Sequence, residues 1–301
     1  MNRVPQRPLL AFAVALTAIG VLSVMDAVMK SLVLALGIYV TSVWRSLLGV
    51  GFGATLYLPA RKSWPGRKTL RLHVARGVVI TFMGIAFFWG LGRTPMAQAI
   101  ALTFIAPLIA LALSAIVLGE RAGPRVVGGS ILAFAGVALI LLGQARAELG
   151  RDALLGSAAI LFSALCYAVN IVMMRAQAMA ARPPEITFFQ NGTIAVLMLL
   201  SLPFMGGVAW PGGHWPALIA ASLMSTGGVL LFAFAYARAE ASYLSVTEYS
   251  AFLWAAALGW LVFGEHVSAM TLAGAVLIVG GCLIAARKGA ARLEPEIEAV
   301  A

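Results

Sequence analysis

Three charged side chains lie well inside long apolar runs of the sequence: Asp26, Arg45 and Glu248. A charge near the centre of a membrane helix costs about 2.5 to 3.5 kcal/mol on insertion scales, so such residues usually mark a solute or ion path. Asp26 and Arg45 could approach each other and offset their desolvation. We favour a structural or gating ion pair over direct contact with a substrate. Glu248 could be a proton acceptor or an ammonium partner, and a hydrogen bond to neighbouring helices is an equal alternative.

Uncharged polar side chains also follow helical spacing. Two faces show the pattern i, i+3, i+4, i+7: Ser163, Cys166, Tyr167 and Asn170 form one, and Ser245, Glu248, Tyr249 and Phe252 form the other. Thr81 and Thr226 lie on matching faces of two further runs. Such faces suit a substrate cavity, but close helix packing in membranes favours the same small polar residues. For Tyr167, Asn170 and Tyr249 we favour the cavity, and for any single Ser or Thr both interpretations stay open.

Motifs for catalysis and cofactor binding are not found. Cys166 and Cys282 lie in apolar runs, and too few ligands accompany them for a disulfide framework or a zinc cluster. The glycines from Gly49 to Gly53 lack the preceding strand of a nucleotide-binding loop. No nucleophile and base pair is visible either. We therefore predict no enzyme, no cofactor and no metal.

Composition places the chain in lipid. Of the 301 residues 62% are apolar and 11% are charged, which is too little polar surface for a soluble globule of this size. The net charge of +10 is confined to loops and ends, so we expect no nucleic-acid partner. A spanning helix needs about 20 apolar residues. Ten runs qualify: 9–29, 37–58, 73–92, 96–118, 125–143, 153–174, 185–204, 215–236, 242–263 and 269–286. We predict an all-α membrane protein with ten transmembrane helices.

The chain is a duplication. Gly119-Glu120 closes one apolar run and Gly264-Glu265 closes another, at an offset of 145 residues. Each glutamate is expected near the N-terminus of the next helix, where unpaired amides stabilise a carboxylate. Five helices per copy is an odd number, so the second copy must enter the membrane from the opposite side. Inverted repeats of this kind recur in secondary transporters. We predict one repeat over 1–148 and the other over 149–301.

The basic residues predict how the chain is oriented. With both termini on one side, that side receives sixteen of the 21 Lys and Arg residues, including Arg76, and the other side receives four, including Lys30. Arg45 lies within a helix. The positive-inside rule then places both termini in the cytoplasm. His73 is expected near the membrane interface.

The sequence resembles the drug/metabolite transporter superfamily at several positions. They are Arg45, Arg175 at the end of the sixth run, and the stretch from Pro107 to Gly119-Glu120-Arg121 with Gly128 and Gly136 after it. The likeness is greatest to its ten-helix exporters (EamA-like), including bacterial aromatic amino acid exporters. The resemblance implies a central cavity lined by helices one, three, four, six, eight and nine, with helices two and seven moving. Helices five and ten would be peripheral, which leaves a homodimer through them open.

The polar helix faces and the resemblance together predict a substrate site. Its apolar faces would come from Tyr167, Tyr249, Phe88, Phe104 and Trp254. Its hydrogen bonds to a zwitterion would come from Asn170, Ser245, Thr81 and Thr226. Pro107 is expected to bend its helix, because proline deletes a backbone hydrogen bond and collides with the preceding turn. A tolerated kink without functional motion is the alternative.

The predicted function is export of small amphipathic metabolites across a bacterial-type inner membrane by alternating access. Amino acids, aromatic or apolar ones included, are the favoured substrates, and the lipid bilayer is the other partner. A multidrug or quaternary-amine exporter is the alternative within transport. A structural or receptor-like membrane protein is the alternative from another class, and it would not explain the inverted duplication.

Overall fold

The computed structural model describes residues 8–61, 63–118, 124–146, 150–236, 238, 244 and 247–286. Regular structure within these ranges is entirely helical, which confirms the predicted all-α class. The first half contains α1 (Pro8–Leu36), α2 (Ile38–Tyr57), α3 (Arg67–Leu91), α4 (Met96–Thr103), α5 (Ala106–Leu118) and α6 (Pro124–Arg146). The second half contains α7 (Gly150–Ala180), α8 (Pro183–Leu200), α9 (Leu202–Met205), the 3-10 helix η1 (Gly212–His214), α10 (Trp215–Tyr236), α12 (Ser250–Phe263) and α13 (Ala269–Ala286).

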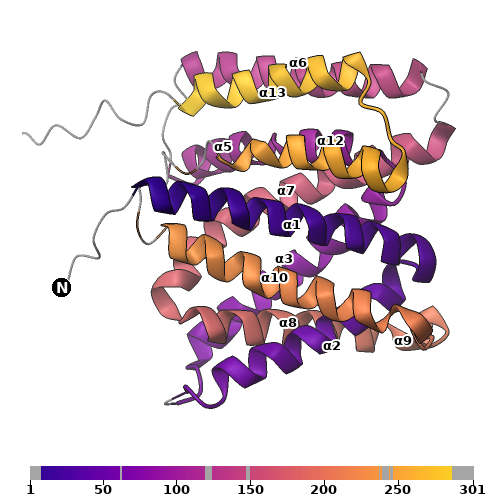
Figure 1. Cartoon of the computed structure of the whole chain (residues 1–301). Helices are drawn as coiled ribbons and strands as arrows, with labels where there is room; N and C mark the ends of the chain where they lie inside the picture. The colour runs from indigo at the N-terminus through magenta and orange to yellow at the C-terminus, as the bar shows by residue number, and fades with distance from the viewer. Residues whose placement is uncertain are drawn as a thin grey trace, which may run out of the picture.

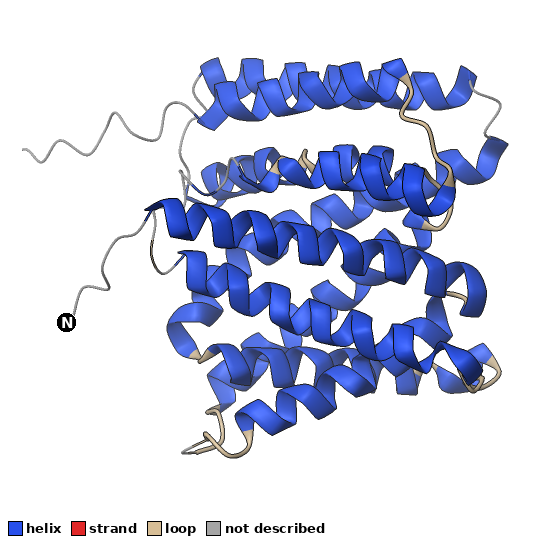
Figure 2. Cartoon of the chain, in the orientation of Figure 1, coloured by secondary structure: helices blue, strands red, loops and turns tan. Residues whose placement is uncertain are grey.

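The helices lie side by side in a bundle with a helix pair at each edge (Figure 1). At one edge α6 packs against α13, and at the other α2 packs against α8. Between them α1 packs along α10, and α3 packs along α7. The start of α1 and the end of α13 lie on the same side of the bundle, which we call the terminal face (Figure 1). The opposite side is the far face, and loops join the helices at both (Figure 2).

Length and hydropathy fit these helices to a bilayer. By length and composition, four described segments can cross a membrane: Leu9–Leu36, Arg67–Leu91, Arg151–Met174 and Gly212–Phe232. Shorter apolar segments are Met96–Ala110, Val127–Gly143, Ser250–Phe263 and Ala269–Ile284. A helix satisfies its own backbone polar groups, as lipid requires. Large apolar side chains such as Phe134 and Leu253, 59% and 69% exposed, then face lipid rather than water.

Each of the ten predicted runs contains a described helix. The fourth run is interrupted, because α4 ends at Thr103 and α5 begins at Ala106. Pro107 has no N–H to donate to the carbonyl of Thr103, four residues earlier, so the α-helical ladder cannot continue there. The Phe104 amide instead bonds to the carbonyl of Ala101 at 3.2 Å, an i to i−3 contact. The structure therefore has a two-residue break, Phe104 and Ile105, between α4 and the start of α5.

Two glycines let the edge helices α6 and α13 approach closely. A Cβ on Gly136 would lie 2.6 Å from the carbonyl oxygen of Gly274, and a Cβ on Gly274 would lie 2.7 Å from that of Gly136. Neither position has room for a side chain without movement of the backbone. Membrane helices associate through such close backbone contact, because lipid supplies little hydrophobic drive between them.

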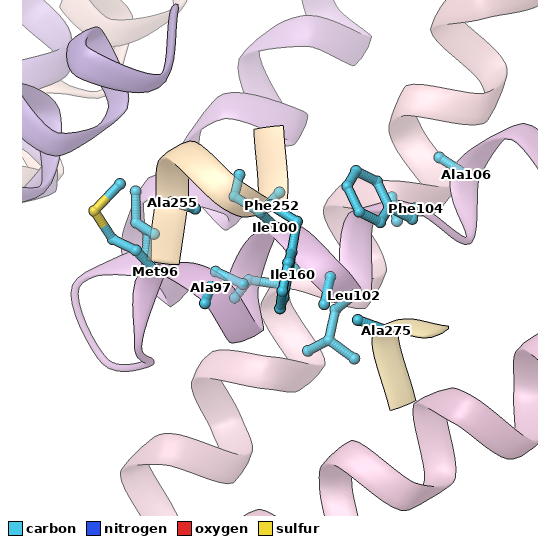
Figure 3. Close-up of a cluster of buried hydrophobic side chains, with 14 of the residues drawn as sticks. Met96, Ala97, Ile100, Leu102, Phe104, Ala106, Ile160, Phe252, Ala255 and Ala275 are labelled. Atoms are coloured by element: carbon cyan, nitrogen blue, oxygen red, sulfur yellow. The ribbon is translucent and has the colours of Figure 1, made fainter. Parts of the chain in front are cut away.

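A core of buried apolar side chains surrounds α4 (Figure 3). Ile160 of α7, Phe252 of α12 and Ala275 of α13 gather around Ile100 and Leu102. This core holds an element of the first half against three elements of the second. The predicted boundary between 148 and 149 falls between α6 and α7, outside the described residues, and it stays a prediction.

Candidate substrate path

A chain of hydrogen bonds runs through the interior from Asn170 to Glu185. Nε of Arg76 donates to Oδ1 of Asn170 at 2.7 Å, and Nη1 of Arg76 donates to Oε1 of Gln177. Nε2 of Gln177 lies 2.6 Å from Nδ1 of His73, and Nε2 of His73 lies 3.0 Å from Oε1 of Glu185. These side chains come from α3, α7 and α8 and connect the three helices.

Most of the side chains in this hydrogen-bond chain are buried. His73 is 0% exposed and Arg76 is 7% exposed, and Asn170 and Gln177 are also buried. The ring of His73 stacks on Phe189 with centroids 4.9 Å apart. Polar groups at this depth cost free energy unless they are bonded, and the chain supplies the bonds. His73, expected near the interface, is therefore enclosed, and Arg76, counted as a charge at the cytoplasmic end, is an interior residue of α3.

Tyr167, on α7, lies near this hydrogen-bond chain. It is within electrostatic range of both Arg76 and Glu248, and Glu248 is also within range of Tyr249. Tyr167 is deep in the protein, yet 39% of its surface is accessible. We interpret this combination as a side chain that borders open space between the helices. The structure thus brings two predicted site residues, Tyr167 and Asn170, to the neighbourhood of Arg76, and a third, Glu248, to that of Tyr167.

Asp26 of α1 and Arg45 of α2 form a second charged group. Both are surrounded by protein and lie within electrostatic range of each other. Each still keeps part of its surface accessible. They do not make the direct ion pair that we expected, since neither belongs to an ion pair in the described part of the chain. The guanidinium carbon of Arg45 lies 5.7 Å from the ring centroid of Phe88, and its Nε has no hydrogen-bond partner among the described residues. The two charges therefore stay separate at a partly open position.

An ion pair joins residues of the two halves at the far face. Nζ of Lys30 binds the carboxylate of Glu265 and the carbonyl oxygen of Thr94, the latter at 2.7 Å. Lys30 is 4% exposed, and its Nζ lies 5.0 Å from the ring centroid of Phe263. The other carboxylate oxygen of Glu265 accepts the Met96 amide at 2.7 Å. We call these contacts the far-face clamp. Lys30, assigned by charge to the outer side, is in fact a buried residue of α1.

The clamp corrects one expectation about Glu265. We expected its carboxylate at the start of the next helix in the sequence, α13, but it caps α4 instead. Gly264 has a φ of 67°, and the Glu265 amide turns back to bond the carbonyl of Gly259 at 3.0 Å. This turn directs the glutamate across the bundle to the first half. Glu120, its equivalent by the offset, lies outside the described residues.

Phe104 and Tyr249 line an apolar groove of about 630 Å³ between α1, α12 and α13. Their ring centroids are 5.4 Å apart, with the planes at 82°. Phe12 and Leu16 of α1 border the same groove. Phe104 is 9% exposed, and its carbonyl accepts a contact from the thiol of Cys282 at 3.2 Å. The groove therefore offers an apolar wall, with most of the Phe104 ring held in the core.

The remaining predicted residues have mixed positions. Thr81 and Thr226 donate to carbonyls one turn back on their own helices, at 2.8 and 3.0 Å, as the packing alternative allows. Phe88 is buried, 7% exposed, although we expected it to face a substrate. Trp254 is 42% exposed and its ring lies against Gly20 of α1. Ser245 lies outside the described residues.

Sequence reasoning missed the two residues that α3 contributes to the hydrogen-bond chain, His73 and Arg76. A usable signal existed, because His73 and Arg76 are three apart while Asn170 and Gln177 are seven apart. Both spacings place the paired residues on one helix face. Two polar faces of that kind indicate facing helices.

Two ranges of the chain, 9–142 and 154–287, each match the EamA-like transporter family. Together they cover most of its length, so the protein belongs to the EamA-like transporter family. It is a multi-pass membrane protein and a membrane transporter.

Relatives in this family move different solutes. The chain is 27% identical to the pseudopaline exporter CntI of Pseudomonas aeruginosa over 270 residues, which are 88% of this chain and 92% of that protein. It is 30% identical to a riboflavin transporter of Rhizobium johnstonii over 223 residues, 71% of this chain and 70% of that protein. A protein of known crystal structure, 24% identical, has a TM-score of 0.62 over 93% of this chain and 98% of its own, which shows a shared fold. Neither named relative is described as an amino acid exporter, so the predicted likeness to aromatic amino acid exporters gains no support here.

Proposed function

We propose that this protein is a secondary transporter that exports small amphipathic metabolites, with amino acid-like compounds as the leading class. The observation that carries the proposal is the set of deep but accessible side chains, Asp26, Arg45 and Tyr167. Opposite charges beside aromatic rings suit a solute that carries both an ammonium and a carboxylate group on an apolar body. Glu248, close to Tyr167, is the candidate for proton coupling or for binding the ammonium group.

Alternating access between two inverted halves is the mechanism we propose. The double match to one family supports a duplicated chain. The packing supports it too, because the offset of 145 converts the pair α1 and α10 into the pair α7 and α3. It likewise converts α1 with α12 into α7 with α5, and both of those pairs are in contact. Inverted halves that rock about a central site expose it to each side in turn.

In this mechanism the far-face clamp holds one end of the path shut. Lys30 and Met96 belong to the first half and Glu265 to the second, so the two contacts of Glu265 join the halves. Both halves must separate there before a solute can leave at the far face. We place that face outside the cytoplasm, as the distribution of Lys and Arg predicts.

A multidrug or quaternary-amine exporter is the second candidate, and the apolar groove beside Tyr249 and Phe104 favours it. A permanent cation needs only a carboxylate and aromatic faces, and it makes no use of Arg45. The two candidates predict different solute preferences, which transport measurements can separate.

The experiment is solute counterflow in proteoliposomes. Radiolabelled amino acids, a quaternary amine, riboflavin and a nucleotide sugar are compared with and without a pH gradient, using wild type, Asp26→Asn, Arg45→Gln and Glu248→Gln. We expect amino acid-like solutes to move and the Asp26 and Arg45 variants to lose most of that transport. Movement of the quaternary amine alone would establish the second candidate. If no solute moves in protein that stays folded by its thermal unfolding curve, the proposal is wrong.

A further inference from the structure

Arg76 is a buried cation whose partners in the structure are neutral. Two of its three guanidinium nitrogens bond to the side-chain oxygens of Asn170 and Gln177. Within the described part of the chain no carboxylate lies within 4.0 Å of it. Arginine cannot lose its proton in a protein, so the charge persists. A buried cation is normally compensated by an anion, and here the protein places two amides around it.

The chain behind Arg76 fixes its orientation. Because Oε1 of Gln177 accepts from Arg76, the Gln177 amide nitrogen must donate to Nδ1 of His73. His73 then carries its proton on Nε2 and donates it to Glu185. Every donor therefore points from Arg76 towards Glu185, which makes the hydrogen bonds mutually reinforcing. The carboxylate stands two neutral side chains away, so it stabilises the arrangement without neutralising the guanidinium directly.

The third nitrogen of Arg76 is left open. Nη2 makes no hydrogen bond to the residues that the structure describes, and it is not among their enclosed polar atoms that lack one, which are Arg45 Nε, Tyr57 Oη and Ser250 Oγ. It is therefore not fully enclosed, although Arg76 as a whole is 7% exposed. Tyr167, which is 39% exposed, lies within electrostatic range of Arg76. Arg76 follows Arg67, the first residue of α3, by nine positions, which places it about 14 Å along the helix.

We propose that Arg76 is a second anion-binding residue of the transport path, in addition to Arg45, and that it binds a carboxylate of an organic-acid or amino acid-like solute through Nη2. This inference rests on the proposed transport function and narrows its substrate class. With two nitrogens already bonded, the guanidinium offers one N–H₂ group, which suits a single carboxylate better than a phosphate group that calls for several cations. Asn170, Gln177, His73 and Glu185 are positioning residues, since they act through Arg76.

The test compares acids with their amides. L-Phenylalanine and 3-phenylpropionate are measured against phenylalaninamide and 3-phenylpropionamide, both in proteoliposome transport and as stabilisers of the purified protein in thermal unfolding. Wild type should prefer each acid. In Arg76→Gln the preference should fall at least about tenfold, because a hydrogen bond to a charged group is lost. Arg71→Gln, on an exposed position of the same helix, is the matched control and should keep the preference.

A second variant separates anion binding from a purely structural role. Asn170→Asp places a carboxylate against Nε of Arg76 and so neutralises the guanidinium without occupying Nη2. If Arg76 only ties α3 to α7, this change should leave transport intact or improve stability. If Arg76 binds solute, Asn170→Asp should be well folded and should lose the preference for acids. This variant also decides the question if Arg76→Gln does not fold.

The outcomes distinguish this inference from the proposed function. Acid stabilisation that depends on Arg76, without transport of any compound, keeps the anion site and removes the transport proposal for these solutes. Transport of acids and amides at equal rates, or a preference that both variants retain, overturns the anion site and leaves the transport function standing. No stabilisation and no acid preference in wild type also overturns it.

Discussion

Single residues on the far face have the clearest energetic consequences. Lys30 and Glu265 are a mostly enclosed ion pair that also satisfies the Thr94 carbonyl and the Met96 amide. Removing one partner leaves the other charge buried and uncompensated, at a cost of about 3 to 5 kcal/mol. Replacing both with apolar residues of similar size is far less costly, because no lone charge remains.

The first prediction follows from this asymmetry. Lys30→Met and Glu265→Leu should each lower the thermal unfolding midpoint of the purified protein strongly, and the double variant should recover much of the loss. Glu265→Leu should be the more damaging of the two, since it also leaves the Met96 amide without its acceptor. Equal midpoints for wild type and both single variants would show that the clamp contributes nothing to stability.

The residue scale is also where sequence reasoning was weakest. Helical spacing placed Tyr167 and Asn170 on one face of α7 and Glu248 on a separate face, and their role as substrate residues stays a prediction. Arg76 was missed because it is only the fourth residue of the predicted run 73–92 and was therefore counted among the cytoplasmic charges. The helix α3 begins at Arg67, six residues before the predicted run, so its polar first turns already lie inside the bundle.

At the scale of elements, close helix approach decides which pairs can form. The α6 and α13 pair depends on glycine at the contact. Gly128 lies on the same helix as Gly136, yet a Cβ at that position would meet no described atom within 4 Å. The contrast provides a test within one helix.

The second prediction uses that contrast. Gly136→Val should lower stability by about 1 to 3 kcal/mol, because the added atoms meet the backbone of α13. Gly128→Ala should change stability little or raise it slightly, since alanine favours helix. Reversible unfolding in mixed micelles would measure both. A Gly136→Val protein as stable as wild type would contradict the close packing of this pair.

Elements were the most predictable part of the molecule. Continuous apolar runs of membrane length predicted the main helical segments, and the ends of α2 and α10 fell within one residue of the predicted runs. The break at Phe104 was foreseen only as a bend at Pro107, because a proline signals a lost hydrogen bond but not how the neighbouring turn compensates. Contacts such as the one between Glu265 and α4 could not be predicted from the sequence, because they depend on how the loop after α12 folds in three dimensions.

At the scale of the whole molecule, transport requires that the space beside Tyr167 open to one face and then to the other. The clamp joins the two halves at the far face, and the hydrogen-bond chain joins α3, α7 and α8 deeper in the bundle. If opening the clamp is the step that exposes the path at the far face, weakening it should change access to Tyr167 from that side.

The most direct measurement is accessibility of a single cysteine at Tyr167→Cys, with Cys166 and Cys282 replaced by alanine, to a membrane-impermeant maleimide applied to each face in turn. Labelling from the terminal face should occur in the protein with an intact clamp, and adding Lys30→Met should produce labelling from the far face as well. If the cysteine is reached from neither face in either background, there is no solute path between the halves.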